Sequence, residues 1–180
     1  DVFLEPTHPY QRSSAVNLSR AGNNRGMELL SEKNYQEALP YFQKALQNAQ
    51  KAGDDAFSLT CLNNIGSMQK LLQEYAAALQ TLDMGLEKAA QISVEIDKAI
   101  QEQLTPDMLA KPEVQAEIAE LKNPTLIRRM QYHKIGCLKG LKRDEEADAL
   151  ARQLWQDCTQ ANDTRTVADL KQEGYDFEEK

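Results

Sequence analysis

Residues 34–46, NYQEALPYFQKAL, decide the fold of this chain, because their apolar side chains recur with the period of an α-helix. Tyr35 and Ala38 begin a stripe of apolar positions three and four residues apart, which would cover one face of a helix. The pattern returns 40 residues later in EYAAALQTLDMGL, residues 74–86, where Tyr75 takes the place of Tyr35. Repetition at this period is typical of stacked helical hairpins.

Small residues accompany both copies of the motif. Gly26 and Gly66 precede the two segments with the same spacing of 40 residues. A third, weaker copy contains Gly136 and, after the next turn, Ala147 at the position of Ala38. We expect all three glycines to lie where two antiparallel helices cross closely, because a larger side chain would push the helices apart.

Outward from the repeats, the helical pattern predicts a single domain over residues 15–173. The helix that begins at Tyr75 is expected to continue to about Leu104. Residues 91–123 fit no repeat and are expected to form an inserted helical segment, a small added core, a partner surface or a dimer contact. Residues 1–14 contain two prolines and no helical period, which predicts an extended arm, and residues 174–180 are expected to be a polar tail.

Composition narrows the class of protein. The chain has 180 residues, 41% of them hydrophobic, and a net charge of -7. This acidic balance argues against nucleic acid as the main partner, and no apolar run approaches the length of a membrane span. The three cysteines show no CxxC spacing and are expected to be buried thiols. No glycine-rich phosphate loop or catalytic signature is present, so we expect no cofactor.

At the repeated residues the chain resembles the tetratricopeptide repeat family, closely over about residues 19–90 and moderately over 125–160. The resemblance implies an all-α superhelix of about three hairpins, with the inserted segment and a C-terminal capping helix. It also implies a protein–protein interaction module, such as an adaptor, co-chaperone or assembly factor. The spacing of 40 residues is longer than the standard repeat of the family.

The resemblance implies that the first helix of each repeat lines an inner groove that holds a segment of the partner. The candidate groove residues are Arg20, Asn23, Met27, Asn63, Asn64, Ser67, Lys70, Arg129, His133 and Lys134. Asparagine amides can pair with a peptide backbone, and basic side chains can hold carboxylates. On the first helices basic residues outnumber acidic ones, and on the second helices acidic residues predominate, so the expected partner is peptide-like or acidic.

Three alternatives stay open at this stage. The chain could be a dedicated inhibitor or immunity-type partner of one specific protein, using the insertion and the arm. His133 and Cys137, four residues apart on one helix, could form a metal pair or a catalytic dyad, although no third ligand is evident. The two-carboxylate clamp of some family members is not expected, because only Asn64 and Lys134 match its residues.

The sequence gives conflicting indications about cellular location. The first residue is Asp1 and not methionine, and together with the arm this slightly favours an exported or periplasmic chain. The unpaired cysteines favour a reducing compartment instead.

Overall fold

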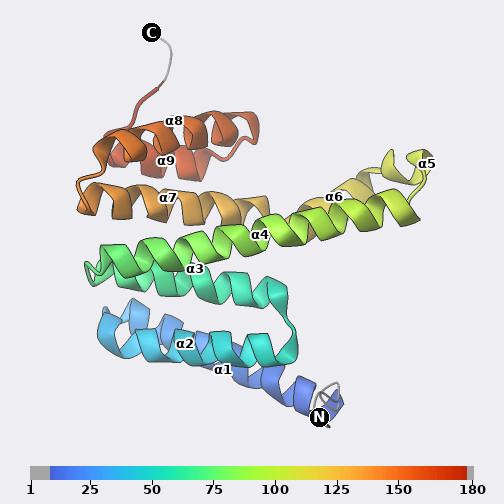
Figure 1. Cartoon of the computed structure of the whole chain (residues 1–180), viewed down its shortest axis with the longest axis horizontal. Coiled ribbons are helices and arrows are strands. Elements are labelled where there is room, and N and C mark those ends of the chain that lie inside the picture. Colours follow the sequence, from blue (N-terminus) through green and yellow to red (C-terminus); the bar gives the residue numbers. More distant parts are fainter. Residues whose placement is uncertain (1–8, 178–180) are drawn as a thin grey trace, which may run out of the picture.

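The computed structural model describes residues 9–177, and within this range the chain forms nine α-helices and no strand. The helices are α1 (Pro9–Ser31), α2 (Tyr35–Ala52), α3 (Asp55–Leu71), α4 (Tyr75–Gln103), α5 (Pro106–Leu109), α6 (Pro112–Lys122), α7 (Pro124–Gly140), α8 (Asp144–Gln160) and α9 (Thr164–Gln172). Figure 1 shows three hairpins, α1–α2, α3–α4 and α7–α8, stacked one on the next. The all-α superhelix predicted from the sequence is confirmed.

The two helices of each hairpin are joined by a short turn that contains one residue in the left-handed conformation. These residues are Lys33, Gln73 and Lys142, with φ angles of 62°, 63° and 59°. A positive φ reverses the chain within three residues, so the second helix can return along the first. The three turns therefore mark equivalent positions, 40 residues apart between the first two repeats and 69 apart between the second and third.

Close packing at Gly26 and Gly66 is confirmed. A Cβ atom added at Gly26 would lie 2.7 Å from Cε1 of Phe42, and one added at Gly66 would lie 2.6 Å from Cγ of Leu82. Phe42 and Leu82 are both fully buried, so neither side chain has space to move away.

The same expectation for Gly136 is wrong. An added Cβ there would approach the flexible side chain of Lys70 in the preceding repeat, at 3.1 Å, and not the helix α8. The offset of 69 residues places Ile135, and not Gly136, at the position of Gly66. Ile135 is 1% exposed and belongs to a core cluster with α8 residues. In the first two hairpins a glycine on the first helix leaves space for Phe42 or Leu82 on the second, whereas in the third hairpin Ile135 on the first helix fills that space itself.

The inserted segment consists of the overhang of α4 together with α5 and α6. Helix α4 has 29 residues against 17 in α3, so its second half extends beyond the hairpin, as Figure 1 shows. Lys122 on α6 forms an ion pair of 2.6 Å with Asp97 on the overhang. No residue of α5 or α6 is buried, so the small added core considered from the sequence does not form. Too few layers surround these apolar side chains to exclude water from them.

The two ends of the chain differ from expectation. Helix α1 begins at Pro9, so residues 9–14 of the predicted extended arm are helical, while residues 1–8 lie outside the described part. Proline is well tolerated in the first turn of a helix, where its missing N–H has no intrahelical partner. The predicted tail is not wholly polar, because Tyr175 is buried and the ring of Phe177 lies 5.7 Å from that of Trp155. Tyr175 and Phe177 show no helical period, so nothing in the sequence indicated that they pack against the body of the protein.

Helix α9 closes the end of the stack as a capping helix. Its Leu170 is fully buried in one cluster with Trp155 and Ile135, so the single tryptophan packs beneath the terminal helix. Asp163 begins α9 by accepting hydrogen bonds from the backbone N–H and the hydroxyl of Thr166, and it also pairs with Arg128 at 2.7 Å. The last helix is thereby fixed to α7 by both apolar and charged contacts.

Candidate functional site

We call the surface shared by the first helices α1, α3 and α7 the first-helix face. A row of asparagines crosses it between the first two repeats. Asn64 Nδ2 donates a hydrogen bond of 2.9 Å to Asn23 Oδ1, and Asn63 Nδ2 donates one of 3.3 Å to Asn64 Oδ1. Three of the predicted groove residues are therefore brought together, across two helices, and they are bonded to one another.

The equivalent pair at the next junction is Asn63 and His133. The turn offsets of 40 and 69 residues carry Asn23 onto Asn63 and Asn64 onto His133. Both side chains are buried, at 7% and 8% exposed, yet Asn63 Oδ1 and His133 Nδ1 have no hydrogen-bond partner. The equivalent residues are therefore joined by a hydrogen bond at the first junction, whereas at the second each leaves one buried polar atom without a partner.

His133 lies in a positive environment. Burial, together with the charges of Lys70 and Arg129, lowers the pKa of His133 to about 3. The ring is therefore neutral at physiological pH, with one nitrogen able to donate and the other to accept. Next to it, the ring of Tyr132 lies 5.6 Å away, and Lys70 Nζ lies 5.2 Å from the centre of that ring.

The structure therefore gathers Lys70, Arg129 and His133 around Tyr132, between α3 and α7. Lys70 and Arg129 are partly exposed, and neither forms an ion pair within the described residues. Lys134, which the sequence placed with them, is directed elsewhere: its Nζ lies 2.6 Å from Asp83 Oδ1 on α4. Lys134 directly follows His133 on α7, and this step of one residue along the helix turns its side chain towards the second helix of the preceding hairpin.

The remaining predicted groove residues are less distinctive. Arg20 and Met27 are exposed on α1, and Ser67 is partly exposed on α3. Met130, one turn before Lys134 on α7, is fully buried, and its Sδ would meet an added Cβ on Gly85 at 3.0 Å. That position therefore contributes to the core and not to a surface.

His133 and Cys137 do not have the properties of a reactive pair. Burial raises the pKa of the Cys137 thiol to about 11, so it stays protonated while His133 stays neutral. Within the described residues no group of three or more His, Cys, Asp or Glu side chains could hold a metal ion. Cys61 and Cys158 are also buried and free of disulfides, as the sequence predicted.

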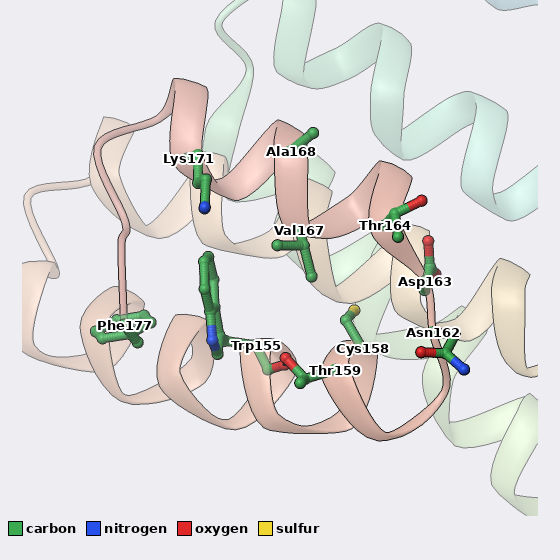
Figure 2. A pocket seen from close by; sticks show the side chains of 10 residues that line it. All are labelled: Trp155, Cys158, Thr159, Asn162, Asp163, Thr164, Val167, Ala168, Lys171 and Phe177. Carbon is green, nitrogen blue, oxygen red and sulfur yellow. The ribbon is translucent and has the colours of Figure 1, made fainter. Parts of the chain in front are cut away.

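A groove of about 700 Å³ runs between α8 and α9, and Figure 2 shows its lining. Trp155 rises from α8 towards Lys171 on α9, and Phe177 lies beyond the indole. The two charged residues of the lining are both engaged within the chain: Asp163 pairs with Arg128, and Lys171 Nζ lies 5.6 Å from the centre of the Trp155 ring. The groove is therefore a seam that holds the capping helix.

A second groove, of about 580 Å³, lies where the inserted segment meets the start of α3. We call it the insertion groove. Its lining comprises Asp55, Ala56, Leu59, Ile92, Ile96, Glu117, Glu120, Leu121 and Asn123. Three helices contribute to it, and two of them, the α4 overhang and α6, belong to no repeat.

Some of these features were missed by sequence reasoning. The role of Tyr132 as a platform for Lys70 depends on the packing of α3 against α7, which no local pattern reveals. The acidic rim of the insertion groove left a weak signal, because Glu120 and Leu121 follow Glu117 on α6 at spacings of three and four residues.

Comparison with known proteins agrees with the repeat pattern. Residues 18–91, which span more than half of α1, all of α2 and α3 and the first half of α4, match the family described as tetratricopeptide repeat. No curated protein and no solved structure matches the chain. Within the described residues, no helix is both long enough and apolar enough to cross a membrane.

Proposed function

Because residues 18–91 belong to the tetratricopeptide repeat family, generally a protein–protein interaction module, we propose that this chain binds an extended, acidic segment of another protein on its first-helix face. In this role it acts as an adaptor, co-chaperone or assembly factor, and the family is typically non-catalytic.

The observation that carries the proposal is the unpaired positive charge around Tyr132. The chain has 28 acidic residues against 21 basic ones, so a basic side chain has many possible partners within the fold. Lys70 and Arg129 nevertheless form no ion pair among the described residues, since the one carboxylate that reaches Tyr132, that of Glu173, accepts from its hydroxyl at 3.3 Å. By contrast, Lys134, Arg128 and Lys88 are each paired. Carboxylates of a partner can supply the missing counter-charges.

The asparagine row supports recognition of a main chain beside these charges. Asn23 and Asn64 are partly exposed, and each amide has more hydrogen-bonding capacity than its one or two observed bonds use. An extended segment laid along α1, α3 and α7 presents its own N–H and C=O groups to such amides. The backbone thus contributes affinity and the acidic side chains contribute selectivity.

The proposal is tested with peptides selected on the immobilised chain from a displayed random library. We expect the selected peptides to be rich in Asp and Glu. Their affinity, measured by titration calorimetry, should fall about tenfold or more in Lys70→Ala and Arg129→Ala, because a charged hydrogen-bonded contact contributes on the order of 1.5–3 kcal/mol. Lys44→Ala, an exposed lysine on α2, is the matched control and should bind as the unmodified chain does.

Two results would contradict this function. One is a selected set without acidic residues. The other is an affinity that is equal in Lys70→Ala, Arg129→Ala and Lys44→Ala, because binding would then not involve the first-helix face.

A further inference from the structure

The insertion groove carries apolar surface that nothing in the described chain covers. Its base is Leu59 on α3, which is 5% exposed, and its walls include the half-buried Ile92 and Ile96 on the α4 overhang. At the rim, Leu121 on α6 is 58% exposed. A leucine this exposed beside a hollow lined by isoleucines is typical of a surface that becomes covered on binding.

The groove resembles a helical bundle in which the position of one helix is vacant. The α4 overhang and α6 lie side by side and meet the start of α3, as Figure 1 shows for α4 and α6. Three helix segments around one apolar hollow leave an open side along which a further helix can pack. An amphipathic helix fills such a hollow with side chains at positions i, i+3, i+4 and i+7.

The charges around the groove favour an occupant with positive charge. Its lining contains three acidic side chains, Asp55, Glu117 and Glu120, and no basic one. Two lysines on the surrounding helices are already engaged, since Lys88 pairs with Asp55 and Lys122 pairs with Asp97, each at 2.6 Å. Glu117 and Glu120 form no ion pair within the described residues, so two carboxylates at the rim remain available for a partner.

We propose that the insertion groove is a second protein-binding site, which takes a basic amphipathic helix of a partner. Leucine-like side chains of that helix enter the hollow between Ile96 and Leu121, and its flanking lysines or arginines pair with Glu117 and Glu120. The site is separate from the first-helix face and prefers the opposite charge. The chain can therefore hold two different segments at once, an acidic extended one and a basic helical one.

Three synthetic peptides of equal length test the proposal on the full chain. The first places leucines at i, i+3, i+4 and i+7 with lysines on the flanking positions. The second replaces the lysines with glutamates, and the third replaces the leucines with serines. We expect the first peptide to bind at least about tenfold more tightly than either of the others, measured by calorimetry. In NMR spectra, the amide shifts that it causes should lie in the α4 overhang, α6 and the start of α3.

Variants of the chain separate this site from general attraction between a basic peptide and an acidic protein. Glu117→Lys/Glu120→Lys should weaken binding of the leucine–lysine peptide by about tenfold or more. Glu87→Lys/Glu113→Lys makes the same change in net charge at exposed residues outside the groove and should have little effect. Leu121→Ser should likewise weaken binding, whereas Val94→Ser, at a valine that is 68% exposed and outside the lining, should not.

Several outcomes would overturn the proposal. Equal binding of the lysine and glutamate peptides, or equal loss in the two double variants, would show that the groove does not select a basic helix. If the chain dimerises in sedimentation experiments and Leu121→Ser abolishes the dimer, the occupant is a second copy. If Phe3→Ser/Leu4→Ser shifts the groove amides without any peptide, the occupant is the N-terminal segment of the chain itself. None of these outcomes bears on peptide binding at the first-helix face.

Discussion

The two junctions between repeats use the same positions with different side chains. At the first junction, Asn64 donates to Asn23 and both are partly exposed. At the second, the equivalent residues Asn63 and His133 are buried and leave one polar atom each without a partner. The difference shows that the repeat architecture specifies which positions lie at a junction. The residue types at those positions decide whether their polar atoms form hydrogen bonds.

The hairpins that form the junctions differ in a related way. In the first two, a glycine on the first helix makes room for Phe42 or Leu82 on the second. In the third, Ile135 occupies the glycine position and is itself buried. Both solutions fill the core, with the larger side chain supplied by one helix or by the other.

The largest expected effect on stability comes from removing a core side chain of the third hairpin. Ile135→Ala removes a buried side chain and should lower the free energy of unfolding by about 2–5 kcal/mol, because the surrounding side chains can only partly close the cavity. Urea denaturation measures the loss. Met84→Ala, at a methionine that is 51% exposed on α4, serves as the control, with an expected change below about 0.5 kcal/mol. Equal losses in both variants would mean that Ile135 does not hold the third hairpin together.

Filling the glycine position has the next largest effect. Gly66→Ala should cost about 1–3 kcal/mol, because its Cβ would overlap the buried Leu82. Gly136→Ala should be neutral or stabilising by up to about 1 kcal/mol, since alanine favours the helix and the side chain of Lys70 can move. Thermal or urea denaturation distinguishes the two. If Gly136→Ala were the more damaging change, the assignment of Ile135 to the glycine position would be wrong.

The second junction should respond to pH through His133. The folded chain leaves this ring neutral down to about pH 3, whereas the unfolded chain protonates it near 6.5. The unfolded state therefore binds the extra proton, and the free energy of unfolding falls as the pH drops from about 6.5 towards 3, by up to about 1.4 kcal/mol per pH unit.

His133→Asn should remove this pH-dependent contribution to the free energy of unfolding. It also gives the second junction an asparagine at the position that Asn64 occupies in the first. The quantity to measure is the difference in unfolding free energy between the unmodified chain and the variant, at several pH values in this window, so that the carboxylates common to both cancel. A difference that does not change with pH would show that His133 is protonated equally in the folded and unfolded states.

The smallest effect is expected at the first junction. Asn64→Ala removes the bond to Asn23 and should cost about 0.5–1.5 kcal/mol. Asn24→Ala is its matched control, because Asn24 stands at the equivalent position of the first repeat and is exposed. That control should change stability by less than about 0.5 kcal/mol. Equal effects would show that the asparagine row contributes nothing across the junction.

Much of the fold could be predicted because helical periodicity and its interruptions are local. Thr105 and Asn123, each followed directly by a proline in the sequence, cap the next helix by accepting from Met108 N–H and Leu126 N–H. The candidate site was predicted less completely. Asn23, Asn63 and Asn64 do lie together, and so do Lys70, Arg129 and His133, but Lys134 pairs with Asp83 on another helix. Which way a long side chain points depends on neighbours that are distant in the sequence.

The sequence by itself determined the repeat. Residues 34–46 and their copy 40 residues later specify amphipathic helices, and the glycines at the crossings specify how closely those helices pack. Only the tertiary structure decided which residue fills the third crossing, which polar atoms remain unpaired at the second junction, and where the inserted helices leave an open groove. The physical reason is that periodicity follows from the geometry of one helix, whereas burial, pairing and hollows depend on surfaces that several helices form together.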